Sequence, residues 1–142
     1  MIEYIKNDEI VLAIIIRASY LKDGIEFFSS ESDSQQLGYM NRPAGYTIAP
    51  HCHNLIPRQV NLTQEVLFIK NGSIRVDFYD NDKLYLKSSI LRALDVILLV
   101  TGGHGFKFLS NSEVIEVKQG PYNGLLDKIK FEPINDESIK LI

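Results

Sequence analysis

Short runs of β-branched and aromatic residues, separated by turn-forming residues, occupy most of the chain and leave little room for helices. The clearest pair of runs is residues 65–70 and 73–79, because the Asn71-Gly72 step between them tolerates positive φ angles and is typical of a tight hairpin. Further strands are expected at residues 10–18, 24–28, 45–48, 84–87, 95–101, 106–109 and 114–118. Helical periodicity is weak, with one short turn at residues 125–129. The pattern predicts an all-β barrel or sandwich with little helix.

Length and composition favour one compact domain over residues 1–142, with a hydrophobic fraction of 45% that is enough for a core. The formal net charge is −3 and no block of basic residues is present, so we expect no nucleic-acid partner. The longest apolar run, residues 10–16, is too short to span a bilayer, and the N-terminus lacks the features of a signal peptide. Cys52 is the only cysteine, which excludes an intrachain disulfide. These features predict a cytoplasmic protein that does not enter the membrane.

The three histidines of the chain point to a metal site. His51 and His53 would share one face of a strand, with Cys52 on the other face, because side chains alternate along a strand. Glu65 opens the next apolar run, and His104 follows a double glycine. Three imidazoles and one carboxylate suit a divalent transition metal and leave positions open for water or substrate. We therefore predict one ion, of Fe, Mn, Zn, Ni or Co, bound by His51, His53, Glu65 and His104.

The spacing of these residues resembles the first motif of the cupin family. Gly45 is followed by five residues and then by His51-x-His53, and Glu65 is followed by six residues and then by Gly72, as in that motif. Eleven residues separate His53 from Glu65, where the family usually has three or four, so a loop is inserted here.

Residues 94–106 resemble the second cupin motif, in which an apolar strand and a glycine turn lead to the fourth ligand. His104 stands at that ligand's position, whereas Leu94 replaces the leading glycine and the usual proline is absent. The resemblance covers about residues 40–110 and implies a jelly-roll β-barrel of two packed antiparallel sheets, with a metal held inside by motifs within residues 45–106.

Two further segments, residues 38–43 and 115–122, together with Asp127-Lys128, are similar to a subgroup of small bacterial cupins linked to polysaccharide and sugar metabolism. This similarity implies a sugar or sugar derivative as the substrate class.

Six polar residues are candidates for the mouth of the barrel. Lys118 and Tyr122 are candidate acid–base groups. Arg42 and Arg58 could clamp a carboxylate or phosphate through the planar guanidinium fork, with solvated loop charges as the alternative. The remaining candidates for substrate binding are Tyr46 and Gln119.

These observations leave three hypotheses open. The first is a metal-dependent isomerase or epimerase that acts on a small polar molecule such as a sugar. The second is an Fe(II)-dependent dioxygenase on the same ligands, and the third is a non-catalytic module that binds a small molecule. All three share the fold, so the fold does not decide between them. A homodimer is expected in each case, with residues 10–18 as a candidate for strand exchange.

Overall fold

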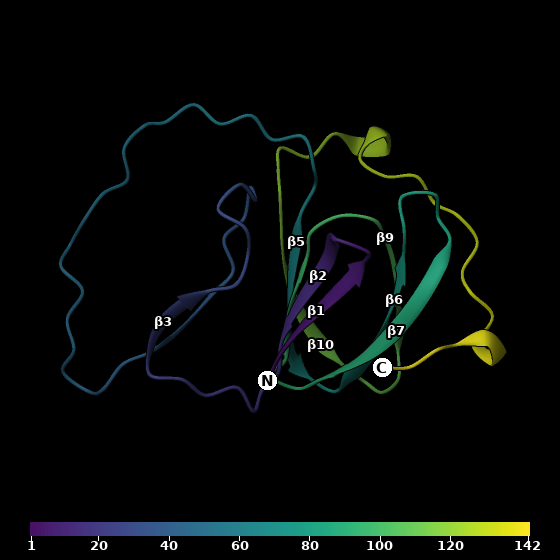
Figure 1. The fold of residues 1–142 in the computed structure, drawn as a ribbon, viewed down its shortest axis with the longest axis horizontal. Coiled ribbons are helices and arrows are strands. Elements are labelled where there is room, and N and C mark those ends of the chain that lie inside the picture. The colour runs from purple at the N-terminus through teal and green to yellow at the C-terminus, as the bar shows by residue number, and fades with distance from the viewer.

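A computed structural model of the chain consists of ten β-strands and two short 3₁₀ turns (Figure 1). It describes the backbone of residues 1–142 and every side chain except that of Leu125. The elements in chain order are β1 (Ile2–Asn7), β2 (Ile10–Ile16), β3 (Gly24–Phe27), β4 (Gly38–Asn41), β5 (Glu65–Asn71), β6 (Ser73–Tyr79), β7 (Tyr85–Arg92), β8 (Val96–Leu99), β9 (Gly103–Phe108), β10 (Glu113–Lys118), η1 (Gly124–Leu126) and η2 (Asp136–Ser138).

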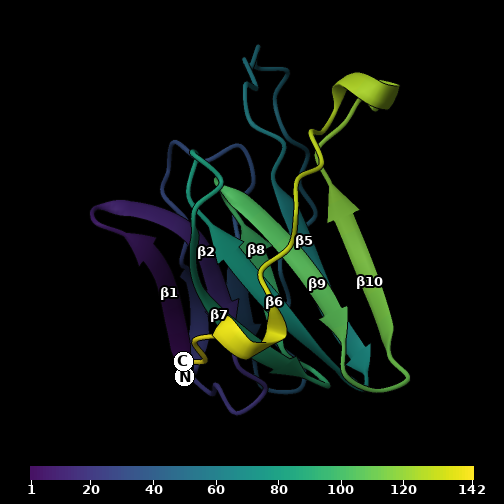
Figure 2. The same cartoon turned by 90° about the vertical axis from the view of Figure 1, so that its right-hand side faces the viewer.

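The strands form two sheets and a separate hairpin, all with antiparallel pairing. The larger sheet has the order β1-β2-β8-β5-β10, the smaller one the order β7-β6-β9, and β3 pairs only with β4. Figure 2 shows the smaller sheet in front of the larger one, with the C-terminal segment passing in front of both. The predicted all-β class and the antiparallel sheets are therefore confirmed. The hairpin predicted at Asn71-Gly72 is wrong, because β5 and β6 belong to different sheets and do not pair, so this turn leads the chain from the larger sheet into the smaller one.

The main core lies between the two sheets. Its members alternate along most strands, as the two-residue period of a strand requires, so that one face of each sheet is apolar. The neighbours Leu12 and Ala13 both belong to the cluster, because the register of β1 and β2 shifts beside them. The buried residues of this cluster are Ile5, Leu12, Ala13, Ile15, Leu67, Ile69, Ile74, Val76, Phe78, Leu91, Ile97 and Leu99.

A second apolar cluster covers the other face of the larger sheet. Ile14, Ile16 and Leu98 point outward from β2 and β8 and pack against Leu37 and the partly buried Tyr39 of β4. Both faces of β2 are therefore covered, which explains why its sequence is apolar at every position.

The long connection between β4 and β5 differs from the expected structure. No strand forms between Asn41 and Glu65, so the strand predicted at residues 45–48 is wrong, and His51 and His53 lie in an irregular, exposed loop. Pro43, Pro50 and Pro57 contribute to this outcome, because proline has no N–H group to donate to a neighbouring strand. Figure 1 shows the connection as a wide loop on the left, away from the two sheets.

Three smaller differences affect the later argument. The strands β1 and β4 were not predicted, because their short runs lack clear alternation. The strand β9 begins at Gly103 rather than at residue 106, so His104 lies within a strand. The strand β2 lies inside its sheet between β1 and β8, so residues 10–16 offer no free edge to a second copy, whereas β1 and β10 do.

In the described part of the chain, no helix has the length and hydrophobicity needed to cross a membrane.

Truncating a side chain on the inner face of the larger sheet should lower the free energy of unfolding more than truncating one on its outer face. Ile69 of β5 is fully buried between the sheets, whereas Ile115 on the neighbouring strand β10 is 53% exposed. We expect Ile69→Ala to lower the free energy of unfolding by about 2–5 kcal/mol, because it removes buried methyl groups and leaves a cavity. Ile115→Ala should change it by less than about 0.5 kcal/mol. Urea denaturation measures both, and equal losses would contradict this account of the core.

Candidate functional site

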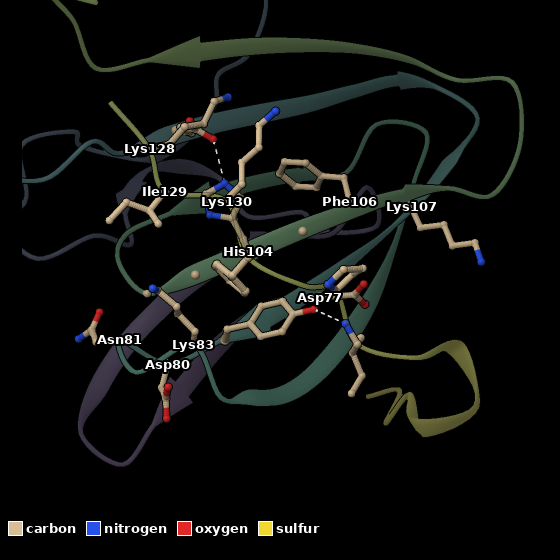
Figure 3. Close-up of a pocket in the computed structure, with 18 of the residues that line it drawn as sticks. Asp77, Asp80, Asn81, Lys83, His104, Phe106, Lys107, Lys128, Ile129 and Lys130 are labelled. Atoms are coloured by element: carbon tan, nitrogen blue, oxygen red, sulfur yellow. Dashed lines mark hydrogen bonds and ion pairs between the residues drawn. The ribbon is translucent and has the colours of Figure 1, made fainter. Parts of the chain in front are cut away.

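A cavity of about 1030 Å³ extends around the free edge of β9 (Figure 3). On the inner side of this edge it meets Glu65 of β5 and Glu116 of β10, and on the outer side it meets β6 and the C-terminal segment. The turn between β6 and β7 completes the wall. The cavity therefore touches both sheets, the turn between β6 and β7 and the C-terminal segment.

Glu65 and His104 meet across the two sheets at this cavity. The Nε2 atom of His104 lies 3.2 Å from Oε2 of Glu65, and the two side chains are 28% and 15% exposed, respectively. Glu65 shares the inner face of β5 with the buried Leu67 and Ile69, and His104 shares the inner face of β9 with Phe106. The pair therefore stands where the apolar rows of the two inner faces end.

The start of β5 is held by contacts of the residue before it. Gln64 is 1% exposed, and its side-chain oxygen accepts hydrogen bonds from the Ser34 hydroxyl and the Gln35 backbone amide, both at 2.9 Å. Its backbone oxygen accepts a bond from the Gln119 amide at 3.0 Å. These bonds fix the position at which the long loop ends and Glu65 begins.

Positive charge around Glu65 keeps its carboxylate ionised. The hydrogen bond from His104 is the largest cause that lowers the pKa of Glu65, and partial burial opposes it. The charges of His104, Lys118 and Lys128 lower this pKa further. The Nζ atom of Lys118 lies 3.9 Å from Oε1 of Glu65. The carboxylate is thus a proton acceptor at neutral pH.

The outer side of the cavity contains an ion-pair network. Arg75 donates to both carboxylate oxygens of Asp77, at 2.7 and 3.0 Å, and the Ser88 hydroxyl donates to the same carboxylate at 2.5 Å. Asp136 of the C-terminal segment pairs with Arg75 at 2.9 Å and also with Lys107. These two cations lower the pKa of Asp136. The network fastens the C-terminal segment to β6 and β9.

Aromatic contacts fasten the same segment nearer to His104. The ring of Phe131 packs edge-on against Tyr79 with 5.0 Å between centroids, and the Tyr79 hydroxyl accepts a bond from the Ile134 amide at 2.9 Å. A Cβ atom at Gly103 would lie 2.9 Å from the Phe131 ring, so only glycine permits this approach beside His104.

The structure brings together two of the four predicted metal ligands, Glu65 and His104. The rings of His51 and His53 lie 5.4 Å apart, and Nδ1 of His51 contacts the Ala49 carbonyl at 3.0 Å. Across the described residues, no three His, Cys, Asp or Glu side chains gather as a metal site would require. The donor types suit a divalent ion, but the four donors form two separate pairs, so this arrangement does not fit a metal site as it stands.

The other predicted site residues occupy three places. Arg42 stacks over the Tyr46 ring at 4.6 Å, and Arg58 is exposed in the same long loop. Lys118 contacts Glu65 and also lies 5.7 Å from the centre of the Tyr122 ring. The backbone of Gln119 holds Gln64. Glu65 and His104 line the cavity, and Lys118 contacts Glu65.

Several cavity residues were missed by the sequence analysis, including Arg75, Asp77, Tyr79 and Asp136. The alternation of Arg75, Asp77 and Tyr79 with apolar residues in β6 indicates a polar second face. No sequence pattern indicated that the C-terminal segment covers that face.

Comparison with known proteins gives no relative for this chain. No family model matches it, and neither the curated proteins nor the solved structures searched contain a match. The geometry of the Glu65–His104 pair and its cavity therefore carries the functional argument.

The pair predicts a specific titration. In the wild-type protein, the pKa of Glu65 should lie below that of an ordinary glutamate, and His104→Ala should raise it because the main hydrogen bond is lost. Carbon-13 NMR of labelled glutamate carboxyls measures this pKa. His53→Ala is the control and should leave it unchanged, since His53 lies in the loop.

The same shift sets a dependence of stability on pH. Because the folded state lowers the pKa of Glu65, the ionised carboxylate stabilises the fold above the unfolded-state pKa, and this contribution is lost as the pH falls through the folded-state pKa. The free energy of unfolding of the wild type should therefore fall more steeply with decreasing pH than that of Glu65→Gln, as measured by urea denaturation at several pH values. An equal decrease in both proteins would contradict the lowered pKa of Glu65.

Proposed function

We propose that this chain is a cupin-like jelly roll that binds a small polar molecule, such as a sugar or sugar derivative, and isomerises or epimerises it. The observation that carries this proposal is the 3.2 Å contact between Glu65 and His104 at the cavity wall. The cupin resemblance of residues 40–110 and the two facing antiparallel sheets support the family assignment.

The chemistry follows from the two side chains. Isomerisation next to a carbonyl requires a base that removes a proton from carbon and an acid that protonates the carbonyl oxygen. The ionised Glu65 would accept the carbon-bound proton, and the His104 imidazole would donate a proton to the oxygen, giving an enediol. Glu65 would then give its proton to the former carbonyl carbon, and the neighbouring hydroxyl would give its proton to His104 as the new carbonyl forms there. The isomerisation is thus complete without any net change in atoms or electrons. Lys118, 3.9 Å from Glu65, would favour the ionised state of the base.

Hydrogen exchange on carbon tests this role. Aldoses, ketoses and their phosphate esters are incubated with the protein in D₂O, and proton NMR records deuterium entering next to the carbonyl. Glu65→Gln should slow the exchange by about 10²–10⁴-fold, because the amide cannot act as the base. Glu113→Gln, an exposed carboxylate that pairs only with Lys70, is the matched control and should leave the rate unchanged. Equal rates in the two variants would refute the assignment of Glu65.

A divalent metal is the second candidate feature, and the paired imidazoles of His51 and His53 favour it. Their loop leads directly into Glu65, so a rearrangement of the loop between Asn41 and Glu65 would be needed to bring all four donors together. Fe, Mn, Zn, Ni or Co would suit this donor set and would supply Lewis-acid chemistry or, for Fe(II), oxygen chemistry. Oxygen consumption with a candidate substrate would favour a dioxygenase, and binding without turnover would favour a non-catalytic module.

Metal content distinguishes the paired arrangement from a four-ligand site. With all four ligands engaged, we expect about one ion per chain by elemental analysis of protein purified without chelators. His51→Ala and His104→Ala should each remove it, whereas Cys52→Ser, at an exposed thiol between the two histidines, should not. Metal that persists in the His104 variant and disappears in the Cys52 variant would exclude this ligand set.

The expected homodimer also stays a prediction. In the larger sheet, the strands that could pair with a second copy are β1 and β10, since the backbone groups on their outer edges have no neighbouring strand.

A further inference from the structure

We propose that the cavity holds its ligand by an anionic group, a phosphate or a carboxylate, which binds to Lys83, Lys128 and Lys130 beside the Glu65–His104 pair. This inference rests on the proposed function for the same site and names the substrate class: a phosphorylated or acidic sugar rather than a neutral one.

The three lysines differ from the other cations at the site. Arg75 and Lys107 pair with carboxylates of the outer network, and Lys118 lies 3.9 Å from Glu65. In contrast, among the described residues no carboxylate lies within 4.0 Å of the amino groups of Lys83, Lys128 and Lys130, although all three line the cavity. Their charge is available to a ligand.

Five of the six carboxylates that line the cavity have a hydrogen-bond or ion-pair partner within the protein, and none of the six lies within 4.0 Å of the three lysine amino groups. Glu65 contacts His104, Asp77 binds Arg75 and Ser88, and Asp136 binds Arg75 and Lys107. The carboxylate of Asp80 accepts hydrogen bonds from the backbone amides of Asp82 and Leu84, and that of Asp127 accepts one from the backbone amide of Asn123. Glu116 has no ion pair among the described residues. Three carboxylates without an ion pair, those of Asp80, Asp127 and Glu116, therefore share the cavity wall with the three unpaired ammonium groups, and two of these carboxylates are held by backbone amides.

The three lysines come from two separate segments of the cavity wall. Figure 3 shows Lys128 and Lys130 on one side of His104 and Lys83 on the other. Lys83 lies in the turn between β6 and β7 with a φ angle of 66°, and its amide bonds to the Asp80 carbonyl at 3.1 Å, so the turn is well defined. Lys130 immediately precedes Phe131, which is held against Tyr79, and Lys128 lies two residues before Lys130. A ligand at His104 would thus lie between the two lysine-bearing segments.

The chemistry of the lysines favours an anion with several oxygens. An ammonium group is a compact charge with three donors, and its hydrogen bonds to phosphate or carboxylate are stronger than those to a neutral hydroxyl. All three lysine residues are exposed at the mouth, so the attraction should be screened by salt.

Isothermal titration calorimetry with glucose 6-phosphate, glucuronate, inorganic phosphate and glucose tests the inference. Glucose 6-phosphate or glucuronate should bind more tightly than glucose, and added salt should weaken this binding. The combined variant Lys83→Gln, Lys128→Gln, Lys130→Gln should lose about tenfold or more of the affinity for the anionic sugar. The order of affinity of the phosphate ester and the carboxylate identifies which anion the site prefers.

The matched control changes the same number of charges elsewhere, with Lys6→Gln, Lys22→Gln and Lys70→Gln, which lie outside the cavity. It should bind the anionic sugar as the wild type does. Three results would each overturn the inference. The two combined variants could lose the same amount of affinity for the anionic sugar, or the wild type could bind glucose as tightly as the anionic sugars. The wild type could also fail to bind any anionic probe at millimolar concentration. Near-ultraviolet circular dichroism confirms that both variants fold.

The outcomes also separate this inference from the proposed function. If neutral sugars alone bind and exchange deuterium in a Glu65-dependent way, the anion site is wrong and the proton-transfer role stands. If anionic sugars bind through the three lysines but Glu65→Gln leaves exchange unchanged, the anion site stands and the catalytic role is wrong.

Discussion

The packing of the two inner sheet faces against one another is the constraint on which the rest of this structure depends. Their shared apolar cluster, which includes Ile69, Ile74, Phe78 and Ile97, fixes how β5 lies relative to β9. Burial of apolar surface provides the driving force, and the alternation of side chains assigns one face of each strand to it. The smaller sheet ends at β9 without a further neighbour, and the cavity forms around that free edge.

The polar groups of the site stand where this packing ends. Glu65 and His104 are partly buried, and such groups are tolerated because each provides the other with a partner. On the outer face of the smaller sheet, Asp136 bridges Arg75 and Lys107 and so holds the C-terminal segment in place. That segment also carries Lys128 and Lys130 to the wall of the cavity that contains the Glu65–His104 pair.

A second ion-pair network joins β1, the end of β2 and the residue before β8 in the larger sheet, and its residues do not line the cavity. Arg17 donates to Glu3 at 2.7 Å and to Asp95 at 3.0 Å, and Asp95 also accepts the amides of Ala18 and Arg92. Asp95 is 4% exposed and is fully engaged in these bonds. In this network the cation Arg17 is paired with carboxylates, whereas the cations Lys128 and Lys130 at the cavity have no ion pair among the described residues.

The sequence by itself determined the all-β class, because the alternation of side chains along a strand is a local property. It also selected Glu65 and His104 as metal ligands, and the structure brings these two together as a pair. The hairpin predicted at Asn71-Gly72 does not form, because the two strands that this turn joins pair with partners in different sheets. The sequence also placed His51 and His53 on a strand that does not form, since proline-rich loops and strand edges are decided by which neighbours are available for pairing. The register that brings Glu65 and His104 within 3.2 Å, and the cover that residues 127–136 give to the cavity, involve contacts between distant parts of the chain. Only the tertiary structure decided those contacts, because their energy depends on packing between whole sheets rather than on any local pattern.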